Sequence, residues 1–173
     1  MTDRTPIETT NLDIYGHPAL PWSRPHDLIT SNPPPNATYF LGTAQPNGLP
    51  HAAGIGPMWV EGDFYFVSSP NARKARELAV NPACTISVRL EGIDVVFEGE
   101  AHRTTDPTTL EKVAKRFSDD GWPATVQGDA FTAPFMAPSG GKGPWHLYRF
   151  TFHTAYGVAT QKPDGATRWR FDH

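Results

Sequence analysis

Apolar and polar residues alternate through the central part of the chain, with the period of two that is typical of half-buried β-strands. Within residues 83–90 every second side chain is apolar, namely Cys84, Ile86, Val88 and Leu90. Shorter β-prone segments lie on both sides of this one. We expect strands at residues 38–44, 51–60, 64–68, 83–90, 95–103, 147–159 and 167–171.

Turn signals and helix signals separate these segments. Gly-containing turns, typical of antiparallel hairpins, lie at residues 46–48, 61–63 and 91–92. Helices are expected at 71–80 and 106–117, where Asp106 can cap the second helix and Pro107 suits its first position. The pattern therefore predicts a mainly β fold with two short helices, in which six or seven antiparallel strands form a closed or partly closed barrel.

The 18 prolines are unevenly distributed along the 173 residues. Because proline lacks an amide donor and fixes φ, the Pro-rich residues 1–36 are expected to form an extended or irregular N-terminal arm, with a short helix around 26–30. Residues 37–173 then form one barrel domain. A second Pro- and Gly-rich segment, 119–144, is expected to be a long loop that acts as a lid or wraps around a dimer partner.

Composition excludes several classes of protein. The formal net charge of −3 excludes a polyanion binder that relies on bulk positive charge. No apolar run reaches the ~18–20 residues of a membrane span, and no secretory signal is recognised, so a cytoplasmic protein is expected. A single cysteine, Cys84, excludes an internal disulfide framework, and the seven histidines show no metal-ligand spacing. We expect no metal site.

The most informative segment is the start of the first expected helix. Three cations lie in its first turns, where the helix dipole is positive: Arg73, Lys74 and Arg76. No acid precedes Glu77 within this segment, and the hydroxyls of Ser68 and Ser69 lie just upstream of the helix. Free amides, hydroxyls and cations together suit a bound phosphate. The alternative is a solvated basic face on a surface helix.

Four segments, in order, resemble the pyridoxamine 5′-phosphate oxidase-like family of flavin-binding split barrels. Residues 64–82 are similar to its phosphate motif, which here reads Ser68-Ser69, then Ala72-Arg73-Lys74-Ala75-Arg76-Glu77-Leu78 and Asn81-Pro82. The later segments are 94–101, 145–157 and 165–171, so the resemblance covers roughly residues 37–171. It implies a split β-barrel with Greek-key connections, and a homodimer with two equivalent cofactor sites at the interface.

The resemblance also implies which residues bind the cofactor. Arg73 and Lys74 would hold its phosphate, together with the hydroxyl of Ser68 or Ser69. The strand that carries Pro57, Met58 and Trp59 would lie against the ring, and Arg168 would reach the cofactor across the dimer interface. No catalytic side chain is implied, because in this family the cofactor transfers the hydride and the protein orients it.

Three departures separate the chain from the true oxidases. Ala72 replaces a serine of the phosphate motif, Asp94 stands where an amide is usual, and residues 170–173 differ from the oxidase ending. The chain looks more like the actinobacterial flavin- or deazaflavin-dependent reductases.

We therefore expect an oxidoreductase that uses FMN or the deazaflavin coenzyme F-420 to transfer a hydride to or from a small conjugated organic substrate. Both cofactors carry a ribityl phosphate, so the phosphate motif does not distinguish them. Frequent Arg, Ala, Pro and Gly suit a GC-rich actinobacterial source, which favours coenzyme F-420. The alternative function is a non-catalytic split barrel that carries a cofactor or binds haem. A barrel without any cofactor leaves the placement of Arg73 and Lys74 unexplained.

Overall fold

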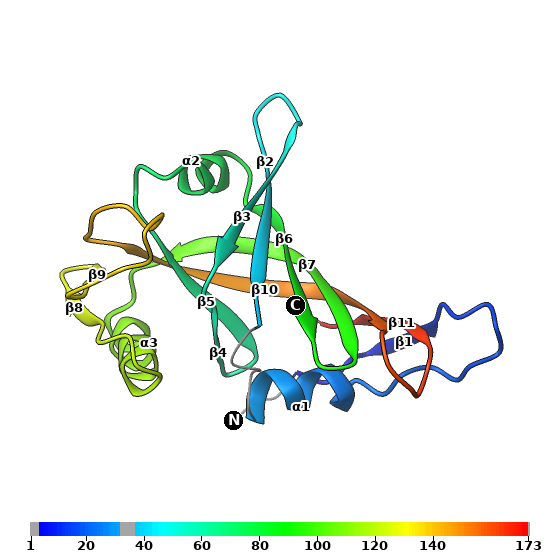
Figure 1. The fold of residues 1–173 in the computed structure, drawn as a ribbon. Coiled ribbons are helices and arrows are strands. Elements are labelled where there is room, and N and C mark those ends of the chain that lie inside the picture. Colours follow the sequence, from blue (N-terminus) through cyan, green and yellow to red (C-terminus); the bar gives the residue numbers. More distant parts are fainter. Residues whose placement is uncertain (1–3, 32–36, 173) are drawn as a thin grey trace.

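The computed structural model describes residues 4–31 and 37–172, and within them three helices and eleven strands (Figure 1). The helices are α1 (Ser23–Ser31), α2 (Arg73–Val80) and α3 (Pro107–Asp119). The first strands are β1 (Glu8–Asn11), β2 (Tyr39–Ala44), β3 (Pro50–Ile55), β4 (Met58–Val60), β5 (Asp63–Ser68) and β6 (Ala83–Leu90). The remaining strands are β7 (Ile93–Thr104), β8 (Thr125–Gln127), β9 (Ala130–Thr132), β10 (His146–Ala159) and β11 (Ala166–Arg170).

Nine of these strands form one antiparallel sheet, in the order β1-β11-β10-β7-β6-β2-β3, with β5 attached to β10 and β4 to β5. The 14-residue strand β10 organises the sheet, because its first half pairs with β5 and its second half with β11, while β7 runs along its other edge. Figure 1 shows the strands crossing steeply as the sheet curls on itself. The predicted mainly β, split-barrel fold is confirmed.

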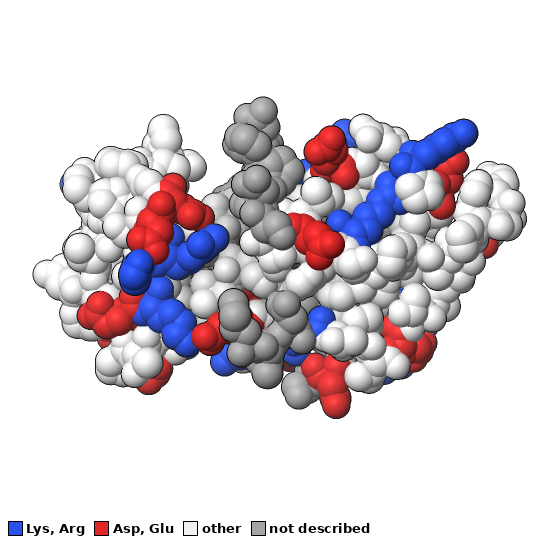
Figure 2. Space-filling model, turned by 90° about the horizontal axis from the view of Figure 1, so that it is seen from below, with Lys and Arg blue, Asp and Glu red and all other residues white. Residues whose placement is uncertain are grey.

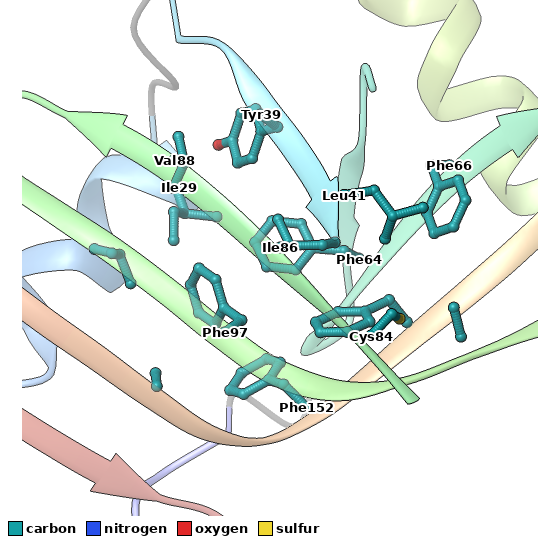
Figure 3. Close-up of a cluster of buried hydrophobic side chains, with 14 of the residues drawn as sticks. Ile29, Tyr39, Leu41, Phe64, Phe66, Cys84, Ile86, Val88, Phe97 and Phe152 are labelled. Atoms are coloured by element: carbon teal, nitrogen blue, oxygen red, sulfur yellow. The ribbon is translucent and has the colours of Figure 1, made fainter. Parts of the chain in front are cut away.

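The barrel interior is filled by the apolar faces of the strands. Figure 3 shows Phe64, Phe97 and Phe152 converging from β5, β7 and β10. The ring centroid of Phe97 lies 5.1 Å from that of Phe64 and 5.0 Å from that of Phe152. The glycine on β7, Gly99, is required here, since a Cβ atom would lie 2.1 Å from the backbone oxygen of Thr151. A second cluster of buried side chains lies between α3 and the sheet: Tyr65, Leu110, Val113, Ala114, Phe117, Ala124, Phe131 and Leu147.

The structure corrects several sequence-based boundaries. Residues 51–60 form two strands rather than one, because the chain leaves β3 at Gly56-Pro57, and β4 then pairs with β5 instead of β2. The described residues hold three helices rather than two, since the short helix expected around 26–30 extends over the whole of α1. Residues 119–144 are not wholly irregular and contain the β8–β9 hairpin.

The N-terminal arm takes part in the sheet. Its strand β1 pairs with β11 in register from Glu8↔Arg170 to Asn11↔Thr167. The indole of Trp22 lies 5.4 Å from Trp169 and 4.8 Å from Phe171, so the arm closes one end of the barrel core.

Charged side chains of both signs are interspersed on the face drawn in Figure 2. Several basic residues of the fold are held in ion pairs, among them Arg149 with Asp63, Lys112 with Glu61 and Arg89 with Asp94. Among residues 4–31 and 37–172, no helix combines the length and the apolar character that crossing a membrane requires.

Candidate functional site

A cavity of about 600 Å³ opens at the end of the barrel opposite the N-terminal arm. In Figure 1 the parts that enclose it, α2, α3 and the segment before β10, lie together on the left. Its lining residues come from the β3–β4 turn, β5, the first turn of α2, the end of α3 and the segment that follows β9. They are Gly54, Ile55, Gly56, Pro57, Met58, Val67, Ser68, Lys74, Phe117, Asp120, Trp122, Phe135, Met136, Ala137, Ser139 and Gly140.

Apolar and polarizable side chains form most of the cavity wall. The long segment 133–144 lies over the cavity and is tied to the barrel by two indoles. Trp122 donates from Nε1 to the carbonyl oxygen of Phe135 at 2.7 Å, and Trp145 donates from Nε1 to that of Gly140 at 3.2 Å. The two indole rings are themselves 5.8 Å apart. A volume in the ~300–1,000 Å³ range with few polar groups is typical of a small-molecule site.

The polar end of the cavity lies at the start of α2. Lys74 is half-buried there, and within the described residues no carboxylate lies at ion-pair distance from its ammonium group. Burial lowers the pKa of Lys74. Ser68 is buried beside it and donates from Oγ to the carbonyl oxygen of Ser69 at 3.1 Å. The N-cap residue of α2 is Ala72, which provides no side-chain bond to the free amides of the first turn.

Arg73 does not line this cavity and binds a buried carboxylate instead. Its Nε donates to Glu77 Oε1 at 2.9 Å. Glu77 is only 5% exposed, and its other oxygen lies 2.5 Å from Thr43 Oγ1 and 2.8 Å from His51 Nδ1. Burial alone would raise the pKa of Glu77, but these hydrogen bonds outweigh it and lower the pKa to about 2. We call Thr43, His51, Arg73 and Glu77 the Glu77 cluster.

The residues predicted to bind a cofactor fall into two groups. Four of them line the cavity together: Pro57, Met58, Ser68 and Lys74. Four do not. Ser69 lines a neighbouring hollow, and Arg73 belongs to the Glu77 cluster. Trp59 packs into the core with its ring 4.9 Å from Phe64, and Arg168 bonds to Glu8 and Thr10 at the far edge of the sheet. The roles of all eight in binding stay predictions.

The neighbouring hollow has a volume of about 500 Å³ and lies beyond the start of α2. It is enclosed by residues 69–72 on one side and 139–144 on the other, and Ser139 and Gly140 line both this hollow and the cavity. Lys142 lies at its exposed rim. The two spaces are therefore neighbours, and we call the second one the outer hollow.

Sequence reasoning did not identify the cavity wall formed by Phe117, Asp120, Trp122 and Met136, nor the Glu77 cluster. The wall depends on how segment 133–144 folds back, for which the sequence offers no local signal. The spacing of Arg73 and Glu77, four residues apart on one helix, did carry a signal, since such pairs are neighbours on a helix surface. Thr43 and His51 come from other strands and could not be assigned in this way.

The described residues contain no metal-ligand cluster, and their cysteine thiol, Cys84, is buried. Within residues 4–31 and 37–172 no cluster of three or more His, Cys, Asp and Glu side chains could hold a metal ion. Burial raises the pKa of the Cys84 thiol to about 12, so this residue is not a thiolate nucleophile. The cavity therefore offers a mainly apolar space with one ammonium group that has no carboxylate partner among the described residues.

Comparisons with known proteins identify the family of this chain. The sequence profile of pyridoxamine 5′-phosphate oxidase matches residues 34–159. A search of functionally curated proteins gave no match. A pyridoxamine 5′-phosphate oxidase-related, FMN-binding protein from Nostoc punctiforme has a similar structure, with 17% identity, a TM-score of 0.54, and coverage of 87% of this chain and 90% of that one.

Two further solved structures share the fold. An FAD-binding protein from Mesorhizobium loti is 16% identical, with a TM-score of 0.53 and coverage of 87% and 95% of the two chains. A haem-binding protein from Mycobacterium smegmatis is 14% identical, with a TM-score of 0.52 and coverage of 76% of this chain and 52% of that one. At these identities the likeness shows the fold, while the profile match extends over most of the chain. The chain therefore belongs to the pyridoxamine 5′-phosphate oxidase family of split β-barrels.

Proposed function

We propose that the cavity binds a flavin-type cofactor, FMN or coenzyme F-420, and that the protein is an oxidoreductase. The reaction would be hydride transfer between the cofactor and a small conjugated organic substrate. One observation carries the proposal. Lys74 is a half-buried cation without an ion-pair partner among the described residues, and it faces an apolar cavity of about 600 Å³. A buried charge is expected to have a partner, and an anionic ligand would supply it.

The residues present suit such a cofactor. The ammonium group of Lys74, the hydroxyl of Ser68 and the free amides at the start of α2 would hold a phosphate. Met58, Trp122 and Met136 would offer polarizable contacts to a planar ring. A bound flavin or deazaflavin would supply the hydride chemistry itself. The chain would orient it and exclude water by means of segment 133–144, which the indoles of Trp122 and Trp145 hold in place.

We also propose that two copies of the chain form a homodimer. Phe40, Val96 and Val158 are exposed on the side of the sheet that faces away from the core. Phe40 and Val96 lie in one cross-strand row, since both pair with Ser87. Exposed apolar side chains on one face of a sheet are a suitable isologous contact. Phe40→Asp should shift the protein from dimer to monomer in size-exclusion chromatography with light scattering, whereas Leu49→Asp, an equally exposed site in the β2–β3 turn, should not.

Titration of the purified protein with FMN and with coenzyme F-420 tests the function. We expect one of them to bind, and Lys74→Ala to weaken binding about tenfold or more, because a hydrogen bond to a charged group contributes about 1.5–3 kcal/mol. Lys162→Ala removes the same kind of side chain from the exposed β10–β11 loop and should leave binding unchanged.

The bound cofactor, once reduced, should then be reoxidised by a small quinone in stopped-flow absorbance measurements. Binding without reoxidation by any conjugated acceptor would favour a cofactor carrier. If haem binds instead of either cofactor, the oxidoreductase proposal is wrong.

A further inference from the structure

We propose that this site selects a cofactor whose phosphate is a diester, with a single negative charge and a further substituent, over a cofactor that ends in a phosphomonoester. Two features of the chain make the selection: Glu77 withholds Arg73 from the cavity, and the outer hollow has room for the substituent. This inference rests on the proposed function and specifies the class of ligand that the site takes.

The described residues place a single positive charge at the polar end of the cavity. Lys74 is the one cation that lines the cavity among the described residues. Asp120 also lines the cavity, and its carboxylate is paired with the guanidinium of Arg116 at 3.8 Å. Arg76, on the same helix as Lys74, is exposed and donates to the carbonyl oxygen of Asn71 at 2.8 Å. One cation matches a phosphodiester, whereas a phosphomonoester carries about −1.5 to −2 at pH 7 and would leave charge unpaired in a half-buried site.

The positive charge of Arg73 is already paired with the carboxylate of Glu77. Its guanidinium binds Glu77 through Nε, and Arg73 lines neither the cavity nor the outer hollow. Thr43 and His51, from β2 and β3, hold the other oxygen of Glu77 and fix the carboxylate beneath the helix. Since the pKa of Glu77 is lowered to about 2, this carboxylate is ionised at neutral pH and offsets the charge of Arg73. Glu77 is thus a positioning residue that acts through Arg73.

The outer hollow offers room for the substituent of a phosphodiester. The outer hollow of about 500 Å³ adjoins the cavity, and Ser139 and Gly140 line both spaces. It begins at the residues that immediately precede α2, so a phosphate held at Lys74 would lie between the two spaces. Lys142 at the rim of the outer hollow suits a second anionic group on the substituent. A phosphomonoester would leave this hollow to water.

The experiment compares cofactors that share a ring and differ at the phosphate. Dissociation constants are measured at pH 7.5 for FMN and FAD, which share the isoalloxazine ring, and for coenzyme F-420 and the phosphomonoester of the same deazaflavin. Within the pair whose ring the protein accepts, we expect the diester to bind at least tenfold more tightly. The two pairs distinguish a dinucleotide from a deazaflavin as the source of the diester.

Two variants separate the two features. Glu77→Gln keeps the size of the side chain and frees the charge of Arg73, so it should tighten monoester binding and reduce the preference at least threefold. Glu91→Gln makes the same charge change in the exposed β6–β7 turn and should leave the preference unchanged. Ser139→Trp fills the junction between the two spaces and should weaken only diester binding, about tenfold, whereas Ser118→Trp at an exposed position of α3 should not.

The outcomes are distinct. If the monoester binds as tightly as the diester of the same ring, the inference is overturned and the proposed function stands. If none of the four compounds binds, the proposed function itself fails. If Glu77→Gln does not fold, as judged by its thermal melt, Ser139→Trp alone decides, and an unchanged diester affinity in that variant overturns the inference.

Discussion

The two helices α2 and α3 begin in opposite ways. The first turn of α3 is completed by its own sequence, because the carboxylate of Asp106 accepts from the amide of Thr109 at 2.8 Å and Pro107 occupies the first helical position. The first turn of α2 has Ala72 as its N-cap, without a side-chain bond, followed directly by Arg73 and Lys74. A missing cap lowers stability by about 0.5–2 kcal/mol, and each cation near the positive end of a helix by about 0.3–1 kcal/mol.

Under the proposed function, this difference separates a helix with a structural role, α3, from a helix that would bind the ligand, α2. Basic residues of α3 lie towards its carboxyl end, where Arg116 complements the dipole. Of α2 and α3, it is α2 that carries the unfavourable arrangement, and Lys74 of its first turn lines the cavity. Among the described residues the ammonium group of Lys74 has no carboxylate partner, and a bound anion would supply a partner. We therefore expect α2 to gain stability from the ligand, and α3 to be indifferent to it.

The largest expected effect comes from reversing the charge at the start of α2. Lys74→Glu places an acid where the helix dipole favours it and where the phosphate would bind. The variant should lose cofactor binding by a factor of 100 or more, while its free energy of unfolding without ligand stays equal or rises by about 0.5 kcal/mol. Isothermal titration and urea denaturation measure the two quantities. A variant that is destabilised and binds normally would contradict the comparison.

Removing the cap of α3 should have the converse effect. Asp106→Ala leaves the amide of Thr109 without its acceptor and should lower the free energy of unfolding by about 1 kcal/mol. Cofactor affinity should not change, since α3 contributes to the cavity only at its other end, through Phe117. Loss of affinity in this variant would show that the two helix starts are not independent.

Adding a capping side chain to α2 should make its start resemble that of α3. Ala72→Ser should raise the free energy of unfolding of the ligand-free protein by about 0.5 kcal/mol, because the hydroxyl accepts from a free amide of α2. The stabilisation gained on adding cofactor should be smaller than in the wild-type protein, since one amide is already occupied. Thermal melts with and without cofactor give both values, and Ala79→Ser, on the exposed end of the same helix, is the control.

A further effect, which is measured at acid pH, belongs to the Glu77 cluster. The folded-state pKa of Glu77, about 2, lies below its ordinary value of 4.5. Its contribution to stability is therefore fully present above about pH 4.5 and is lost as the pH falls towards 2. Glu77→Gln should show a weaker loss of stability over this interval than the wild-type protein, in urea melts at a series of pH values. Identical slopes for the two proteins would exclude Glu77 as an ionised, hydrogen-bonded group.

Much of the fold follows from local sequence. The strict alternation in 83–90 predicts β6 with its observed bounds, and Asp106-Pro107 predicts the start of α3. The division of 51–60 into two strands was missed, although Pro57 lacks the amide donor that a continuous strand needs there. Local rules could not show that the N-terminal arm adds β1 to the sheet, because β1 pairs with β11, about 160 residues away.

The candidate site was predictable only in part. A basic start of α2 beside Ser68 indicated an anion site, and the structure brings Ser68, Lys74, Pro57 and Met58 to one cavity. Lys74 lines that cavity, whereas Arg73 is bound to Glu77. Glu77 is in turn held by Thr43 and His51, which come from other strands. Such an arrangement is made by tertiary contacts, so neither spacing nor composition could reveal it.

The most direct test of the account is a crystal structure of the protein grown with the cofactor that it binds. We predict the phosphate at hydrogen-bond distance, about 2.7–3.2 Å, from Nζ of Lys74 and from amides of the first turn of α2, with the ring beneath segment 133–144. Arg73 should remain bound to Glu77. A phosphate held by Arg73, with Lys74 in solvent or the ring outside the cavity, would contradict the account.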